Sequence, residues 1–485
     1  MKKALISLLI LLIASAGASL IAQNTASLYK AVQELTKDPA MKHGELSVTV
    51  YSIEQGKPVF SYNSHRAMMP ASLTKMFTTA AGFEKLGSNF RFTTRLAYSG
   101  TIDSKGTLHG DLYIIGGGDP LLGSYRYKQT LPDTLFATWS RAISQAGIRA
   151  VDGRVRYDGT IFDDKVLHDS WMWGDIGNYY GSGVSGLNFH ENMFFIYLNP
   201  GSRVGQAAKL SHTAPAGLSL SIINEVKTGA AKSGDQVVVY GDPITSLRTC
   251  TGTIPLDAKN MAIRASLPRP GKACADLFTQ YLRAHKITIS GASEESLHKP
   301  SNLTTIVDIT SPTYYVIAQY TNMTSNNTYA EAIYKYLGYK GYNLGNYANG
   351  GRVMKDFLSK HGLETAGIVL EDGSGLSKNN RVTTDFVCRF LVEMSRTTYF
   401  GDYQKSLALA GQNGTVKNML SGLPSNVSVR MKSGTLVGLR AFAGYVTTAK
   451  GNRYSFAVIS SDFDCSGAQM RSKLEKVIMK IAEMD

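Results

Sequence analysis

The chain of 485 residues has little cysteine, and its four cysteines are far apart: Cys250, Cys274, Cys388 and Cys465. Their spacing matches neither a zinc site nor a redox motif. His190 and Glu191 are not followed by a second histidine at helical spacing, so the HExxH zinc motif is also absent. We therefore expect no metal and no cofactor. For the cysteines, two alternatives stand: Cys250 pairs with Cys274, or all four are isolated thiols.

Long apolar runs, low-complexity tracts and blocks of like charge are also missing. With 43% hydrophobic and 18% charged residues, the composition is that of a globular protein, which excludes disordered and fibrous classes. At roughly 150 residues per domain, the length predicts about three domains. No window beyond the N-terminal segment offers the uninterrupted apolar stretch of a membrane span, so we expect none in the mature chain.

Acidic residues are too few to balance the basic ones. The chain has 51 Lys and Arg against 37 Asp and Glu, a formal charge of +14. This excess favours an anionic partner. Because the basic residues are scattered singly and not gathered with aromatic residues, we expect no nucleic acid partner. A solvated basic surface and an acidic lipid or polymer partner are the interpretations left open.

The N-terminal segment predicts export from the cytoplasm. Lys2 and Lys3 form a charged region, residues 4–13 an apolar one, and residues 14–18 are small. This is the pattern of a secretory signal peptide over residues 1–22, with an uncleaved anchor as the alternative. We expect a periplasmic or otherwise extracytoplasmic protein.

Hydrophobic periodicity differs between the ends and the middle of the chain. Alternating residues predict β-hairpins over 46–62 and 442–459, and helical spacing is found over 27–35 and 474–481. These parts predict an α+β fold, one antiparallel sheet covered by helices. Residues 91–304 instead contain short β-like runs separated by Gly, Asp and Pro turns, which predicts a β-rich insert.

The first motif that could carry chemistry is Ser72-Leu73-Thr74-Lys75, which opens an apolar helical stretch after Pro70. At this spacing the Ser72 hydroxyl and the Lys75 amine share one helix face, and the helix N-terminus favours negative charge at Ser72. A weak nucleophile thereby gains an adjacent base, provided that the lysine is neutral. A solvated lysine beside a capping serine is the alternative.

The second motif, Ser325-Asn326-Asn327, lies in a predicted turn between two helical segments. A serine there can relay a proton to a leaving group, and an asparagine can hold a substrate amide. Ser and Asn are also ordinary turn residues, so the motif by itself does not indicate a site.

The third motif, Lys432-Ser433-Gly434-Thr435, follows an alternating stretch and is predicted to lie on a strand. Lys432 offers a cation for a carboxylate and Ser433 a hydroxyl. The glycine permits close approach of a substrate backbone. A solvated strand end is the alternative.

In this order, on a helix, a turn and a strand, the three motifs together are far more specific than any one alone. The sequence resembles the penicillin-binding proteins and serine β-lactamases. The long separation of Lys75 from Ser325, and segments such as 117–120 and 372–377, are similar to the low-molecular-mass class C penicillin-binding proteins. Those proteins are D-alanyl-D-alanine carboxypeptidases and endopeptidases.

The resemblance implies a fold and its domains. It implies a penicillin-binding-protein/β-lactamase-like transpeptidase domain formed by residues 23–90 and 305–485. The inserted β-rich region, 91–304, is itself interrupted in this family, which implies a nested domain at about 200–290.

The resemblance also implies roles for the motif residues. Ser72 would be the acylated nucleophile, Lys75 its general base and Ser325 the proton relay. The substrate-binding residues would be Asn327, Lys432, Ser433 and Thr435, with the backbone N–H groups of Ser72 and Thr435 as the oxyanion hole. The sequence departs from the family in having Ser433 where threonine is usual and Asn326 where aspartate is usual, but both keep the functional groups.

Two charged residues are implied to recognise the third residue of the stem peptide, a diamino acid. Asp158 matches the family position that meets its amine. Lys378 stands where relatives often carry arginine to meet its carboxylate, with looser geometry because lysine is not bidentate. A surface aspartate and a solvated lysine are the alternative.

The resulting hypothesis is a serine D-Ala-D-Ala carboxypeptidase, with endopeptidase activity as a second activity of the family. It would act on peptidoglycan stem peptides through an acyl-enzyme, and β-lactam antibiotics would inhibit it. The alternatives are a β-lactamase-like hydrolase, which differs by fast deacylation, and a non-catalytic wall-binding scaffold on the same fold.

Overall fold

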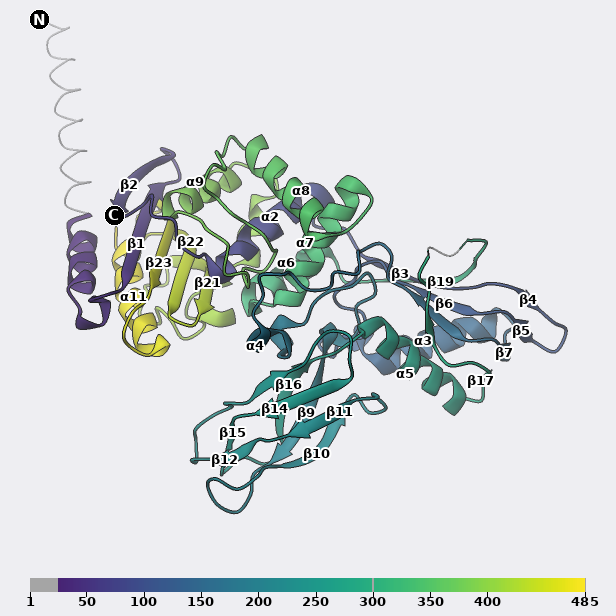
Figure 1. The fold of residues 1–485 in the computed structure, drawn as a ribbon. Helices are drawn as coiled ribbons and strands as arrows, with labels where there is room; N and C mark the ends of the chain where they lie inside the picture. The colour runs from purple at the N-terminus through teal and green to yellow at the C-terminus, as the bar shows by residue number, and fades with distance from the viewer. Residues whose placement is uncertain (1–24, 299–300, 485) are drawn as a thin grey trace, which may run out of the picture.

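The computed structural model describes residues 25–298 and 301–484, so the predicted signal peptide lies outside the described residues. Figure 1 shows a main body that holds both ends of the described chain and an inserted region that extends away from it. Across the described ranges, no helix has both the length and the apolar character needed to cross a membrane.

The main body is built on a six-stranded antiparallel sheet with the order β2-β1-β23-β22-β21-β20. The strands are β1 (Glu45–Ser52), β2 (Lys57–Tyr62), β20 (Ala408–Leu409), β21 (Ser428–Leu436), β22 (Leu439–Thr447) and β23 (Arg453–Ser461). β1 pairs with β23 from Glu45 to Ser52. The two predicted hairpins, from opposite ends of the sequence, therefore join in one sheet.

Helices cover both faces of this sheet, because side chains that alternate along each strand are apolar on both sides. Val48, Val50 and Phe456 pack with α11 (Gly467–Ala482) and with the helix over residues 25–36. Ala441 and Ala457 face the helical lobe on the other side. Its helices are α2 (Thr74–Leu86), α6 (Tyr314–Thr324), α7 (Asn327–Tyr342), α8 (Tyr347–Lys360), α9 (Thr384–Ser395) and α10 (Phe400–Ser406). The predicted α+β fold is confirmed.

The inserted region has a five-stranded sheet, β18-β8-β6-β3-β19, and a four-stranded sheet, β17-β7-β5-β4. Trp139 and Phe278 anchor its core between these sheets and two long helices. The elements are β3 (Thr93–Tyr98), β4 (Thr101–Ile102), β5 (Thr107–His109), β6 (Leu112–Ile115), α3 (Pro132–Gln145), β7 (Ala150–Asp152), β8 (Val155–Asp158), α4 (Trp173–Ile176), α5 (Pro270–Ala284), β17 (Thr288–Ile289), β18 (Glu294–Glu295) and β19 (Thr304–Thr310).

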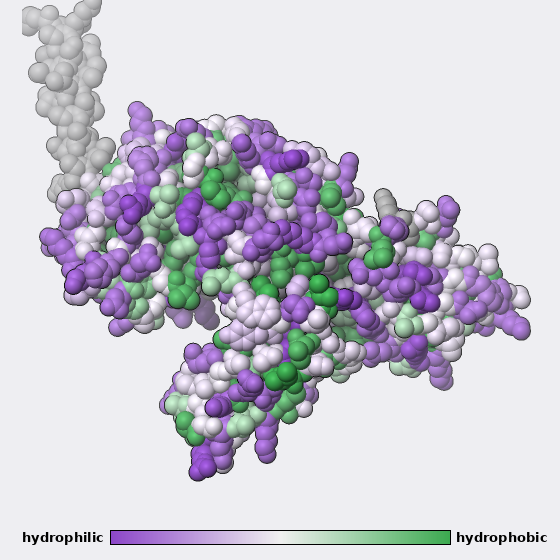
Figure 2. All heavy atoms as spheres, viewed as in Figure 1, coloured by the Kyte–Doolittle hydropathy of each residue, from purple (hydrophilic) through white to green (hydrophobic). Residues whose placement is uncertain are grey.

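A second group of strands forms a nested unit within the insert, drawn below the rest in Figure 1. The strands are β9 (Met193–Asn199), β10 (Lys209–Ala214), β11 (Ser221–Asn224), β12 (Lys227–Gly229), β13 (Val238–Tyr240), β14 (Leu247–Thr251), β15 (Thr253–Pro255) and β16 (Met261–Ser266). In Figure 2, apolar side chains on this face gather where the nested unit joins the rest of the molecule.

The strand pairing places domain limits differently from the sequence. The nested strands run from Met193 to Ser266, whereas the expected range was about 200–290, and α5 packs against β8 of the outer part. Thr304–Thr310 forms β19, which pairs with β3, so the inserted sheet extends beyond residue 304. The β19–β3 pairing joins residues some two hundred positions apart, which local periodicity does not encode.

The cysteines are free thiols: Cys250, Cys274 and Cys388 are buried and Cys465 is half-buried. The alternative in which Cys250 pairs with Cys274 is therefore wrong, and the isolated-thiol alternative is correct. Cys250 and Cys274 pack as apolar groups in the core of the insert.

Candidate active site

Ser72 lies in a 3-10 turn, Ala71–Leu73, that continues directly into α2 at Thr74. The predicted helix thus begins two residues after Ser72. Ala71 has a positive φ of 47°, a left-handed conformation that costs energy for a residue with a Cβ. Gly375 lies against this turn so closely that a Cβ on it would be 1.8 Å from the Ala71 carbonyl oxygen. Tertiary packing therefore holds the turn that contains Ser72 in place.

The Lys75 side chain is fully buried and makes three polar contacts through Nζ. Ser72 Oγ lies at 2.9 Å, Asn327 Oδ1 at 2.7 Å and the Ser374 carbonyl oxygen at 2.6 Å. A neutral amine has two N–H groups and one lone pair. It can therefore donate to the Asn327 and Ser374 oxygens while its lone pair accepts the Ser72 hydroxyl proton.

Burial lowers the pKa of Lys75 to about 7, although the Glu331 and Asp372 carboxylates act in the opposite direction. A base whose pKa lies near neutrality is well matched to proton transfer at physiological pH. Burial therefore makes the neutral lysine that the sequence motif requires accessible near physiological pH.

Ser325 and Asn327 occupy the junction between α6 and α7. Ser325 ends α6 in a left-handed conformation, and the Asn326 side chain caps α7 by accepting from Tyr329 N at 2.9 Å. Asn327, the first residue of α7, donates from Nδ2 to the Tyr180 carbonyl oxygen of the insert at 2.7 Å. The predicted turn is thus an interhelical junction, and its side chains are held by hydrogen bonds to the main body and to the insert.

Lys432 is fully buried beside Ser325. Its Nζ donates to Ser325 Oγ at 3.0 Å and to the Ser433 carbonyl oxygen at 2.6 Å. Burial, with a further contribution from Lys75, holds the pKa of Lys432 well below its usual value. The structure therefore brings Lys432 to the Ser325 hydroxyl, behind the wall of the cleft.

The edge of β21 that carries the third motif is open beside the cleft. Within the described residues, β20 pairs only with Arg430 and Met431, so the strand beyond them has one free edge, on which a peptide can add as a further strand. A Cβ on Gly434 would lie 2.8 Å from the Pro70 carbonyl oxygen. The glycine thus permits close approach of the protein's own backbone, which differs from the substrate role predicted for it.

The three motifs meet in a cleft of about 820 Å³. Its wall includes the following motif residues: Ser72, Ser325, Asn327, Ser433 and Thr435. Lys75 and Lys432 lie buried behind that wall. A cleft of this size is typical of small-molecule and peptide sites.

Of the two charged residues expected to recognise substrate, the structure brings one to the cleft. Lys378 lines it. Asp158 does not line it: the side chain is buried and accepts from Thr160 N in its own turn at 2.8 Å. Asp175, on α4, is the insert's acidic residue in the cleft wall, and the sequence analysis missed it. None of the three motifs contains it.

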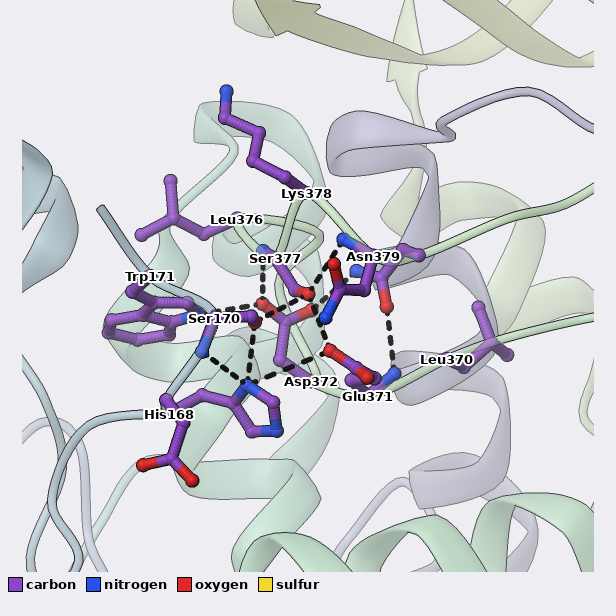
Figure 3. A network of polar contacts seen from close by, with 12 residues as sticks. His168, Ser170, Trp171, Leu370, Glu371, Asp372, Leu376, Ser377, Lys378 and Asn379 are labelled. Atoms are coloured by element: carbon purple, nitrogen blue, oxygen red, sulfur yellow. Dashed lines mark hydrogen bonds and ion pairs between the residues drawn. The ribbon is translucent and has the colours of Figure 1, made fainter.

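Figure 3 shows the polar network that joins the insert to the loop before Lys378. The buried Asp372 carboxylate accepts from Trp171 Nε1 at 2.9 Å and from Ser377 N at 2.7 Å. Ser170 Oγ donates to Ser377 Oγ at 2.6 Å. The same loop carries the Ser374 carbonyl oxygen that contacts Lys75. Through this loop, the insert supports the positions of Lys75 and Lys378.

Glu331, on α7, is a second buried acid that holds this loop. It accepts from Ser374 N at 2.7 Å and from Gly373 N at 3.1 Å. Burial and the nearby Asp372 raise the pKa of Glu331 to about 8. No short motif marks Glu331, which is why the sequence analysis missed it.

We predict that Trp171→Phe destabilises the protein and slows acylation of Ser72. The variant keeps an aromatic ring but leaves one oxygen of the buried Asp372 carboxylate with one donor fewer. The expected loss in free energy of unfolding is about 1.5–3 kcal/mol, the range for a hydrogen bond to a charged group. Chemical denaturation measures it. Trp173→Phe, at a side chain 58% exposed, is the matched control, and equal losses in both variants would contradict the prediction.

The sequence matches the family described as the D-Ala-D-Ala carboxypeptidase 3 (S13) family over residues 28–482. It is 28% identical to a D-alanyl-D-alanine carboxypeptidase of Actinomadura sp. (strain R39), over 93% of this chain and 84% of that one. It is 22% identical to D-alanyl-D-alanine carboxypeptidase DacB of Haemophilus influenzae, over 87% and 86% of the two chains.

Solved structures show the same fold. The crystal structure of penicillin binding protein 4 (dacB) from Haemophilus influenzae superposes with a TM-score of 0.78 at 22% identity, covering 95% of this chain and 98% of that one. The same Haemophilus protein complexed with a β-lactam gives a TM-score of 0.73 at 20% identity, with the same coverage. At these identities the likeness establishes the fold.

Proposed function

Because the chain belongs to the D-Ala-D-Ala carboxypeptidase 3 (S13) family and is a serine-type D-Ala-D-Ala carboxypeptidase, we propose that it cleaves peptidoglycan stem peptides through an acyl-enzyme on Ser72. The observation that carries this proposal is the contact of buried Lys75 Nζ with Ser72 Oγ at 2.9 Å. The proposal also covers endopeptidase activity, in which the protein would cleave peptidoglycan crosslinks whose peptide bond follows a D-Ala residue in the same way.

In the acylation step, neutral Lys75 accepts the Ser72 hydroxyl proton as Oγ bonds to the carbonyl carbon of the penultimate D-Ala. The backbone N–H groups of Ser72 and Thr435 donate to the developing oxyanion. The C–N bond then breaks as Ser325, contacted by Lys432, gives its hydroxyl proton to the leaving amine, and Ser325 is reprotonated by the proton that Lys75 took from Ser72. In the second half-reaction water attacks the ester carbonyl carbon while neutral Lys75 accepts a proton from the water, and the bond to Ser72 Oγ then breaks as Lys75 returns that proton to Oγ, which releases the shortened peptide and restores Ser72.

Substrate selection follows from the charges of the cleft wall. Asp175 and Lys378 supply one carboxylate and one ammonium in the same cleft as Ser72. We propose that they bind the amine and the carboxylate of the diamino acid, with Asp175 in the role first given to Asp158. The formal charge of +14 suits an acidic wall polymer outside the cytoplasm, the compartment predicted by the N-terminal segment.

The proposal is tested with purified protein, a D-Ala-D-Ala-terminated stem peptide and penicillin. We expect free D-Ala from the peptide, and by mass spectrometry a long-lived penicillin adduct on Ser72. Prompt turnover of penicillin would favour the β-lactamase alternative. Folded protein that forms no adduct would favour the scaffold.

We predict that Asp175→Asn reduces the preference for diamino-acid peptides over simple D-Ala-D-Ala peptides by about tenfold, because the amine loses a charge-assisted hydrogen bond. The ratio of kcat/KM for the two peptides measures this preference. Asp169→Asn removes an exposed charge from the same segment as a control. An unchanged ratio in the Asp175 variant would remove this residue from substrate recognition.

A further inference from the structure

The carboxylate that ends a D-Ala-D-Ala peptide requires a positive charge, and Lys432 is poorly placed to supply it. The Lys432 amine is buried behind the cleft wall and already donates to Ser325 Oγ and the Ser433 carbonyl oxygen. Its low pKa further weakens it as a permanent cation. The cation that contacts the carboxylate therefore has to come from another part of the cleft.

Two arginines line the cleft on the side of the third motif. Arg440 lies on β22, opposite Thr435 in the strand pairing, and Arg471 lies in the second turn of α11. Arg471 Nη2 donates to the Thr415 carbonyl oxygen at 3.3 Å, and Thr415 Oγ1 is 2.7 Å from Ser433 Oγ. The guanidinium of Arg471 is thus linked through one residue to the Ser433 hydroxyl.

These two arginines lack an acidic partner: in residues 25–298 and 301–484, neither forms an ion pair. They are also close enough to repel, since burial and then Arg471 lower the pKa of Arg440. Two neighbouring guanidinium groups without a carboxylate favour binding of an anion. The N-terminal end of α11, whose Gly467 and Ala468 line the same cleft, adds positive potential.

The two arginines differ in how many donors they have left. Arg440 donates to three backbone carbonyl oxygens, those of Leu436, Leu439 and Gly467, and so it is held as part of the wall. Arg471 has five N–H groups, and within the described protein it makes one hydrogen bond, to the Thr415 carbonyl oxygen. Arg471 is therefore the one with donors available for a ligand.

We propose that Arg471, beside Arg440, is the cation that binds the terminal carboxylate of the peptide substrate, with the Ser433 and Thr415 hydroxyls as further donors. The inference rests on the proposed function, because it takes D-Ala-D-Ala peptides as the substrate. In this arrangement Lys432 serves the Ser325 proton relay, and the substrate's negative charge is met by the arginines.

The test compares two peptides that differ only at the terminus, a free carboxylate and a C-terminal amide. Arg471→Ala is expected to lower kcat/KM for the carboxylate peptide by about tenfold to a hundredfold, and for the amide by less than about threefold. Arg471→Lys is expected to recover part of the loss, because it keeps the charge without the bidentate geometry. Lys476→Ala, an exposed charge on the same helix, is the matched control.

A second arm does not depend on D-Ala release: the rate of Ser72 acylation by benzylpenicillin against that by its methyl ester. Arg471→Ala is expected to slow the acid and spare the ester, with an unchanged melting temperature. Equal effects on both members of either pair, or no effect on the acids, would overturn the assignment. A wild-type protein that is acylated by penicillin with this selectivity but releases no D-Ala would instead overturn the proposed function alone.

Discussion

The Ser72→Ala variant is expected to release D-Ala more slowly than the wild type by about four to six orders of magnitude, as when other serine hydrolases lose their nucleophile. The reason is that no other hydroxyl in the cleft lies at 2.9 Å from the buried Lys75 amine in the described structure. Penicillin labelling should disappear with it. Stopped-time assays of D-Ala release and intact-protein mass spectrometry measure the two effects.

The variant should still fold. Lys75 keeps its contacts with Asn327 and Ser374, so the expected change in free energy of unfolding is about 1 kcal/mol or less. Ser144→Ala, which removes an exposed hydroxyl on α3, is the matched control. Substantial D-Ala release by folded Ser72→Ala protein would contradict the assignment of the nucleophile.

The second large effect is expected for Lys75→Ala, which removes the proposed general base. General-base catalysis contributes about 10²–10⁴-fold to a reaction rate, so the rate of acylation should fall by about this factor. The variant also leaves the Asn327 and Ser374 oxygens without their donor, at a cost of about 1–3 kcal/mol in stability. The acylation rate by penicillin and chemical denaturation measure the two losses separately.

The pH profile distinguishes a missing base from a disturbed fold. The reactive form of Lys75 is the neutral amine, so the wild-type acylation rate should rise with pH up to about 7 and level off above it. Lys75→Ala should lose this step. Lys85→Ala, at an exposed position on the same helix, should keep both the rate and the step. A Lys75→Ala variant with the wild-type profile would show that another group is the base.

Much of the architecture was predictable because strand and helix periods are local properties. Alternation around Val48 and Val50 predicts a strand from a few neighbouring residues, and β1 is found there. The pairing of β1 with β23 and of β19 with β3 was not predictable in the same way, since it depends on contacts between distant segments. For this reason the strand elements predicted at the two ends of the sequence are found in the structure, whereas the strand pairing indicates domain limits that differ from the expected ones.

For the site, the sequence by itself determined which side chains are available for the chemistry: Ser72, Lys75, Ser325 and Asn327 stand in short motifs whose order and local structure can be read directly. Tertiary structure decided their protonation and their surroundings. The low pKa of Lys75 arises from burial under the 372–377 loop, Asp175 replaces Asp158 in the cleft, and Arg471 reaches it from the C-terminal helix. Burial and electrostatic environment depend on which segments pack together, and no short stretch of sequence contains that information.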